Sequence, residues 1–172
     1  MQRNRFSVEG VFYRGLFNSL ALLLPMAPIH AQTTQRVDRE EVNKKLVQHY
    51  MTLIEDSEFT GWTRYFADSV TFNGTRIPPQ AISGILTQLR RGFPDLHFTI
   101  AGQVAEEDRV VTWGFFEGTH SGEFAGIAPT NQAVKWLGIA IDRIEDGKVV
   151  ELWHEMDMWG VVQQLRAAEP EG

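Results

Sequence analysis

The fold is decided by a stretch that reads Val134-Lys135-Trp136-Leu137-Gly138-Ile139-Ala140-Ile141-Asp142-Arg143-Ile144, then Glu145-Asp146-Gly147, and then Lys148 to Asp157. Two long runs rich in β-branched and aromatic residues flank a short turn, which is the pattern of a β-hairpin. The second run ends in Trp153-His154-Glu155-Met156-Asp157. A few polar groups therefore stand on an otherwise apolar surface, as they do in a lined pocket.

The turn decides which side of this hairpin faces the pocket. Glu145-Asp146-Gly147 suits a three-residue loop closed by a glycine in the left-handed region. That loop pairs Ile144 with Lys148 and places His154 opposite Gly138, a small residue that leaves space in front of the imidazole. The inner face then consists of Trp136, Gly138, Ala140, Asp142, Val150, Leu152, His154 and Met156. A two-residue loop would mix the two faces differently and turn Asp157 inward.

The opposite face of the hairpin combines charges with an apolar centre. Lys135 would lie opposite Asp157, and Arg143 diagonal to Glu151, as ion pairs on a partly wet surface. The apolar centre, formed by Leu137, Ile139, Ile141 and Trp153, is too large to leave exposed comfortably. The pattern therefore predicts a subunit interface on the sheet.

The rest of the chain predicts three helices and further antiparallel strands. Helical spacing over 37–55 is followed by a shorter helical turn over 56–66, capped by Asp56-Ser57, and by a short strand over 69–73. A third helix starts at Pro78-Pro79 and stops at Gly92 and Pro94. Strands follow over 96–106 and 110–119, then a loop over 121–130 and, after the hairpin, a short helix over 160–168. This order indicates an α+β fold, a cone-shaped, curved antiparallel sheet packed on about three helices, open at one end.

The first 31 residues differ from the rest of the 172-residue chain. Arg3, Arg5 and Arg14 precede an apolar run over 16–26, and Ala31 offers a small residue for cleavage. This layout predicts a secretory signal peptide over 1–31, because the run is too short to span a membrane. A retained anchor is the alternative reading. Residues 32–172 then form a single secreted or periplasmic domain without a stable membrane anchor.

Charge and cysteine content limit the partners. Removing the three Arg and one Glu of residues 1–31 from the 16 basic and 22 acidic side chains leaves a net charge of −8. A nucleic-acid-binding protein would normally carry a basic patch, so nucleic acid is not an expected partner. The chain has no Cys, which excludes disulfides, thiolate metal sites and a Cys nucleophile. Its few His residues show no close-spaced metal motif, and no metal is expected.

Several motifs resemble those of SnoaL-like polyketide (ester) cyclases, in the nuclear transport factor two-like superfamily. They are Gly118-Thr119-His120-Ser121-Gly122-Glu123, Gly126-Ile127-Ala128-Pro129-Thr130, Arg143 to Glu151, and Trp153-His154-Glu155-Met156-Asp157. The resemblance covers essentially the whole of 32–172. It implies the α+β cone expected above, usually as a homodimer, with no metal or organic cofactor.

Characterised members of that family close a ring by intramolecular aldol condensation. The resemblance places their acid/base Asp at His154 and their terminal Asp at Asp157. A partner His of those enzymes falls on Ala140 here, whereas the His of the Gly-x-His-x-Gly stretch is retained as His120. Two polar positions of the cyclase site are therefore changed.

His154 is the first candidate for a general base, because an imidazole titrates near neutral pH. A buried histidine bonded to backbone is the competing reading. His120 would lie at the pocket mouth, where it orients substrate, stabilises an enolate oxygen or acts as a plain turn residue. Asp142 would fix the tautomer of His154 or bond solvent, and Asp157 is a base under the two-residue loop. Trp113, Phe116, Trp136, Gly138, Ala140 and Met156 are predicted to line the pocket, and Tyr50, Tyr65 and Asn73 are candidate oxyanion donors.

Two functions follow from these residues. The first is a cofactor-independent enzyme that enolises a small hydrophobic carbonyl compound and cyclises, isomerises or hydrates it. The second is an exported, non-catalytic small-ligand-binding protein on the same fold, an idea favoured by the changed site positions.

Overall fold

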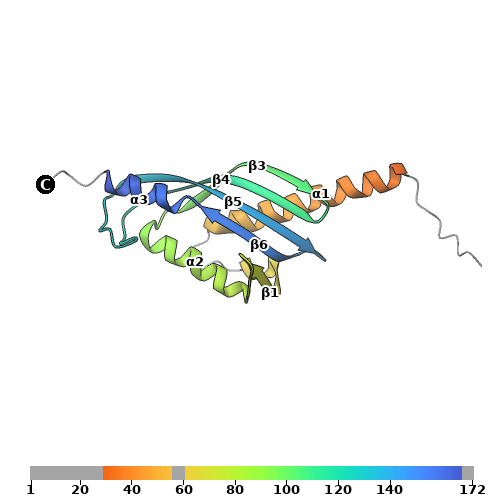
Figure 1. The fold of residues 1–172 in the computed structure, drawn as a ribbon, viewed down its shortest axis with the longest axis horizontal. Helices are drawn as coiled ribbons and strands as arrows, with labels where there is room; N and C mark the ends of the chain where they lie inside the picture. Colours follow the sequence, from red (N-terminus) through yellow and green to blue (C-terminus); the bar gives the residue numbers. More distant parts are fainter. Residues whose placement is uncertain (1–28, 56–60, 168–172) are drawn as a thin grey trace, which may run out of the picture.

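The computed structural model describes residues 29–55 and 61–167. Three helices, α1 (Ile29–Thr52), α2 (Pro79–Gly92) and α3 (Met158–Arg166), accompany one six-stranded sheet. The strands are β1 (Phe66–Phe72), β2 (Thr75–Ile77), β3 (His97–Glu106), β4 (Arg109–Thr119), β5 (Ala133–Glu145) and β6 (Lys148–Met156). Two short 3-10 helices, η1 (Leu53–Glu55) and η2 (Trp62–Tyr65), lie between α1 and β1. The predicted α+β class is confirmed (Figure 1).

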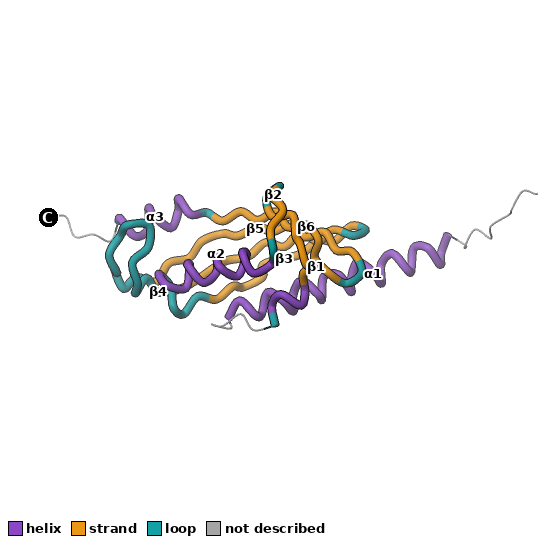
Figure 2. Tube along the Cα trace, turned by 90° about the horizontal axis from the view of Figure 1, so that it is seen from below, coloured by secondary structure: helices purple, strands orange, loops and turns teal. Residues whose placement is uncertain are grey.

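The sheet has the strand order β2-β1-β6-β5-β4-β3 and is mixed rather than purely antiparallel. Strands β3 to β6 form the predicted antiparallel meander, but β1 pairs with β6 in parallel. A short strand alone does not reveal its partner, so the sequence did not predict this pairing. Helix α2 runs across the face of the sheet, with β1 and β2 at one of its ends (Figure 2).

The predicted signal peptide lies outside the described residues except for its last three, and it stays a prediction. The first helix, predicted over 37–55, begins earlier than expected, because residues 32–36 are also part of α1. The first part of α1 extends past the sheet (Figure 1), so Val37 and Val42, two apolar positions of the predicted helical spacing, are exposed. The predicted cap at Asp56-Ser57 lies outside the described residues. No helix of the described ranges is both long and apolar enough to cross a membrane.

The hairpin turn differs from the prediction. Glu145 pairs with Lys148, so the loop has two residues, Asp146 and Gly147, both with positive φ (49° and 71°). Positive φ at both central residues is the geometry of a type I′ turn, which fits the twist of the flanking strands. The three-residue loop was therefore wrong.

The predicted inner face nevertheless holds, because β6 contains a β-bulge next to the turn. Ile144 pairs with Val149, whereas Arg143 pairs with Glu151, which leaves Val150 as an extra residue. A two-residue turn alone would have reversed the inward and outward residues of β6, and the extra residue reverses them again. His154 therefore faces inward, opposite Ala140 rather than Gly138. Val149 takes the inward place predicted for Val150.

Strand β5 shows the alternation most clearly. Its even-numbered residues from Val134 to Ile144 are buried, and its odd-numbered residues are mostly exposed. The outer face leaves five large apolar side chains between 37% and 46% exposed, namely Trp113, Leu137, Ile139, Ile141 and Trp153. This is the surface on which the sequence predicts a subunit interface, and the homodimer stays a prediction.

Candidate functional site

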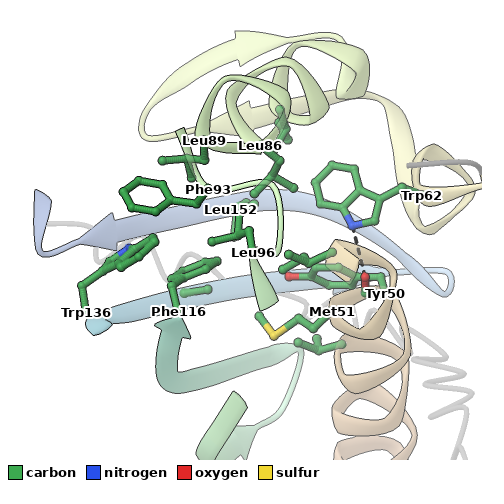
Figure 3. Packing of buried hydrophobic residues seen from close by; sticks show 14 of the residues in the cluster. Tyr50, Met51, Trp62, Leu86, Leu89, Phe93, Leu96, Phe116, Trp136 and Leu152 are labelled. Atoms are coloured by element: carbon green, nitrogen blue, oxygen red, sulfur yellow. Dashed lines mark hydrogen bonds between the residues drawn. The ribbon is translucent and has the colours of Figure 1, made fainter. Parts of the chain in front are cut away.

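A small cavity lies between the inner face of the sheet and the helices α1 and α2. Tyr50 and Met51 come from α1, Leu86 from α2, and Phe116 and His154 from the sheet. The centre of a water molecule can occupy a volume of about 40 Å³ inside the cavity. This is several times the volume that a cavity needs, on the same measure, to hold one water molecule. Figure 3 shows the apolar side chains that surround this region. Among the described residues that line the cavity there is no Asp, Glu, Lys or Arg.

Helix α2 contributes Ile82, Ile85 and Leu86 to the cavity wall, and Ile85 is 38% exposed. Size and lining together favour a small, uncharged and largely apolar ligand.

His154 lies in this cavity, as predicted. Its imidazole is centred 6.1 Å from the ring of Phe116. Neither ring nitrogen has a hydrogen-bond partner among the described residues, so His154 is not the backbone-bonded core histidine of the competing reading. Burial lowers the pKa of His154 to about 4, which keeps the imidazole uncharged at neutral pH.

Gly138 also lines the cavity, but the space in front of it is filled. A Cβ atom at Gly138 would lie 2.6 Å from Cε2 of Phe116. The aromatic ring, not the imidazole, therefore requires glycine at this position.

Asn73 holds the main chain of His154 from outside the cavity. Its side-chain amide donates to the carbonyl oxygen of His154 at 3.0 Å and accepts from the His154 N–H at 2.8 Å. Strand β1 ends at Phe72, so these two bonds continue the pairing of β6 by one residue. Asn73 was predicted to contact substrate as an oxyanion donor. The structure instead makes it a support for His154.

Tyr50 and Asp142 form a buried pair beside the cavity. The Tyr50 hydroxyl donates to Oδ1 of Asp142 at 2.7 Å, and the two residues are 2% and 0% exposed. Burial raises the pKa of Asp142 to about 7, although the hydrogen bond from Tyr50 opposes this shift. Burial, followed by the effect of Asp142, raises the pKa of Tyr50 well above its usual value. Asp142 therefore neither orients His154 nor bonds solvent, the two roles that the sequence predicted.

His120 is buried away from the cavity, not at its mouth. Its Nδ1 accepts from the backbone N–H of Thr130 at 3.2 Å and lies 3.1 Å from the Thr130 hydroxyl. Its main chain bonds Gln132 and Asn131. These contacts tie the start of the loop after β4 to its end, which is the turn role that the sequence analysis left open.

Asp157 caps helix α3 and does not pair with Lys135. Its Oδ1 accepts from the backbone N–H of Gly160 at 2.8 Å, and Lys135 instead forms an ion pair with Glu117. The predicted contact of Arg143 with Glu151 is confirmed, at 2.9 Å. A side-chain oxygen at the N-cap, here Oδ1 of Asp157, satisfies a free N–H of the first helical turn.

Asp157→Ala is therefore expected to lower the free energy of unfolding by about 1 kcal/mol, the usual loss for an N-cap. Urea unfolding followed by circular dichroism measures this change. Asp157→Ser is the matched control, because serine also caps helices and should recover most of the loss. Equal destabilisation by both substitutions would contradict the capping role.

The other predicted wall residues divide into two groups. Phe116, Ala140 and Tyr50 line the cavity as predicted. Trp136 stacks on Phe116 with centroids 5.6 Å apart, and Met156 packs against the core, but neither lines the cavity. The prediction that Trp113 lines the pocket was wrong, because Trp113 lies on the outer face, where its ring covers Gly102. Tyr65 lies outside the cavity wall.

Most of the cavity wall outside the hairpin was not predicted from the sequence. Met51, Trp62, Phe72, Leu86 and Phe98 line the cavity without having been proposed. Leu86 lies on the buried, apolar face of α2, so the available signal was amphipathic spacing. That spacing identifies a buried face but does not tell which buried residues border an empty space.

A curved sheet that closes with helices over one small apolar cavity defines the nuclear transport factor two-like class of α+β proteins. The model of SnoaL-like polyketide cyclases matches residues 44–165, and the chain belongs to this family. AclR from Streptomyces galilaeus is similar at 26% identity and a TM-score of 0.67, over 74% of this chain and 98% of that one.

Two further solved structures share the fold. A SnoaL-like polyketide cyclase from Agrobacterium tumefaciens is 20% identical, with a TM-score of 0.62 over 72% of this chain and 97% of its own. TsrD from Streptomyces laurentii is 22% identical, with a TM-score of 0.64 over 74% of this chain and 96% of its own. A comparison with curated protein sequences found no significant match.

Proposed function

We propose that the protein is an acid/base enzyme that needs no cofactor and removes a proton from the carbon next to a carbonyl group. His154 is the base, and the enolate goes on to cyclise by attacking a second carbonyl group or to isomerise by taking up a proton at another carbon. Addition of water to an α,β-unsaturated carbonyl compound would pass through the same kind of enolate. The observation that carries this proposal is the imidazole of His154, which lies in the cavity with both ring nitrogens free of hydrogen-bond partners among the described residues. A neutral imidazole nitrogen without a partner can accept a proton from a molecule that enters the cavity.

The state of His154 suits a base. An imidazole with a pKa of about 4 is uncharged above about pH 5 and can accept a proton without first losing one. The same low pKa makes it a weak base. The site must therefore lower the barrier by stabilising the negative charge that develops on the carbonyl oxygen.

The cavity narrows the substrate class. It holds no charged side chain among the described residues, so an ionised group would lose its hydration without finding a partner. Compounds of about the size of a five-membered ring suit the space better than a polycyclic skeleton. A longer substrate would have to extend out of the cavity into solvent.

Hydrogen exchange tests the proposal without knowledge of the natural product. The full-length protein is incubated with cyclopentanone in D₂O, and proton NMR follows the loss of the signals next to the carbonyl. We expect exchange faster than with the same concentration of free imidazole, because the cavity orients the ketone against the base. Exchange no faster than with free imidazole would contradict an enzymatic role.

A carrier of small neutral ligands is the second candidate. It is favoured by the replacements at His154 and Ala140, where the family resemblance places an Asp and a His of the cyclases. A carrier would bind cyclopentanone and return it without exchange, so the same NMR experiment separates the two functions.

A further inference from the structure

The pair formed by Tyr50 and Asp142 has more hydrogen atoms to donate than it uses. Tyr50 lies on α1 and lines the same cavity as His154, and its ring reaches from the helix toward the sheet (Figure 3). Asp142 lies behind it on β5, fully buried. Its second oxygen, Oδ2, is also buried and has no partner among the described residues.

The surroundings of Asp142 favour the protonated acid. Its cross-strand neighbours are Val110 on β4 and Leu152 on β6, both buried and apolar. The adjacent Arg143 is engaged with Glu145 and Glu151. An unpaired carboxylate is costly in such a place, so the group keeps its proton until the pH rises to its pKa of about 7.

The titratable groups around Asp142 come from each neighbouring element. Tyr50 on α1 bonds it, and on β6 His154 shares its inner face. On β4 the nearest charged residue is Arg109, which is exposed and pairs with Asp108. Among the described residues, therefore, no cation lies against the carboxyl group to hold it in its charged form.

Two hydrogen-bond arrangements are open to a carboxylic acid beside a phenol. In the first, Tyr50 donates to Asp142, and the acid proton on Oδ2 stays buried without an acceptor. In the second, the acid donates to the Tyr50 oxygen, and the Tyr50 proton can point into the cavity. A carbonyl oxygen in the cavity would accept that proton, so both donors would be satisfied only in the second arrangement.

We propose that Tyr50 donates a hydrogen bond to the carbonyl oxygen of the substrate, and that Asp142 in its acid form is a positioning residue that turns the Tyr50 hydroxyl toward the cavity. This inference rests on the proposed function. When His154 takes the proton, the electron pair of the C–H bond moves into the new C–C double bond, and the negative charge moves to the oxygen. Tyr50 keeps its own proton and stabilises that charge, and His154 returns its proton when the carbonyl is restored.

Ionised Asp142 has the opposite effect. A carboxylate can only accept, so it holds the Tyr50 proton and withdraws it from the cavity. The hydrogen bond to the substrate is therefore present at low pH and lost as the pH rises through about 7. This dependence on pH separates the positioning role from a purely structural one, which a change in pH would leave in place.

The infrared carbonyl band of bound cyclopentanone tests the inference, since a hydrogen bond to the oxygen lowers its wavenumber. We expect a lowered band with the wild-type protein at pH 5.5 that returns toward its value in hexane by pH 8.5. Tyr50→Phe should remove the shift at both pH values and lower the exchange rate at saturating ketone by about 10²-fold. Asp142→Asn should keep the shift at pH 8.5, because the amide can donate to Tyr50 and does not ionise.

Each outcome decides between the claims. A lowered band that does not change between pH 5.5 and 8.5, or that survives Tyr50→Phe, would overturn the inference; the first of these needs no variant and so does not depend on folding. A lowered band without hydrogen exchange would leave the inference standing and remove the proposed function. Exchange with an unshifted band would do the reverse. A ketone that does not bind would overturn both.

Discussion

Replacing His154 by Gln is expected to lower the rate of hydrogen exchange into cyclopentanone by about 10²- to 10⁴-fold, the usual contribution of a general base. Glutamine keeps a polar side chain of similar length in the cavity but cannot accept the proton at any accessible pH. The main chain of His154 should be unaffected, because Asn73 bonds its backbone and not its ring. Initial rates in D₂O, measured by proton NMR at saturating ketone, give the size of the loss.

Glu155→Gln is the matched control. Glu155 is the next residue of β6 and lies exposed on the opposite face. A change there tests whether any substitution in this strand lowers the rate. We expect the control to exchange at the wild-type rate, and a His154→Gln protein that does the same would remove His154 from the mechanism.

The second large effect concerns how the free energy of unfolding changes with pH, because Asp142 and His154 change it in opposite directions. Asp142 has a raised pKa, so its contribution to stability is present below about pH 4 and is lost as the pH rises to about 7. His154 has a lowered pKa, so its contribution is present above about pH 6.5 and is lost as the pH falls to about 4. Between pH 4 and 6.5 the two groups therefore change the free energy of unfolding with pH in opposite directions, and these two slopes largely cancel in the wild-type protein.

Single substitutions should expose each slope. Relative to wild type, the free energy of unfolding of Asp142→Asn should rise by about 3 kcal/mol between pH 4 and 6.5, because the His154 slope is then unopposed. That of His154→Gln should fall by about the same amount over this range. Urea unfolding at half-unit pH steps measures both. The double variant is the control and should parallel wild type, whereas single variants that also parallel wild type would contradict the assignment of both pKa shifts.

The period-two pattern of residues 133–145 was enough to predict the class of fold and the buried face of the hairpin. Alternation of apolar and polar residues records which side of a strand is buried, and burial dominates the energetics of a sheet. Helix α2 could be predicted equally well, because Pro79 at its start and Gly92 at its end mark its limits. The family motifs extended these local patterns to the whole domain.

The details of the site were harder to predict because they depend on contacts between distant residues. The bond from Tyr50 to Asp142 joins positions 92 residues apart, and the two bonds from Asn73 to His154 join positions 81 apart. No periodicity records such pairs. Trp113 was misplaced for a different reason, since a large aromatic residue was assumed to face inward, whereas its ring covers Gly102 on the outer face. A tryptophan on an exposed sheet face therefore does not by itself indicate a pocket.

The extra residue Val150 makes the chemistry of this protein depend on the register of β6 as well as on side-chain identity. If β6 lost the bulge but kept all its residues, every side chain beyond the bulge would exchange faces, because side chains alternate along a strand. Trp153 would then fill the cavity, and the imidazole would emerge on the outer surface. Deleting Val150 itself would instead leave a regular strand in which Arg143 still pairs with Glu151, so His154 would stay in the cavity. In comparisons within this family, the register of the strand after the hairpin turn is therefore as informative about function as the residue found at the catalytic position.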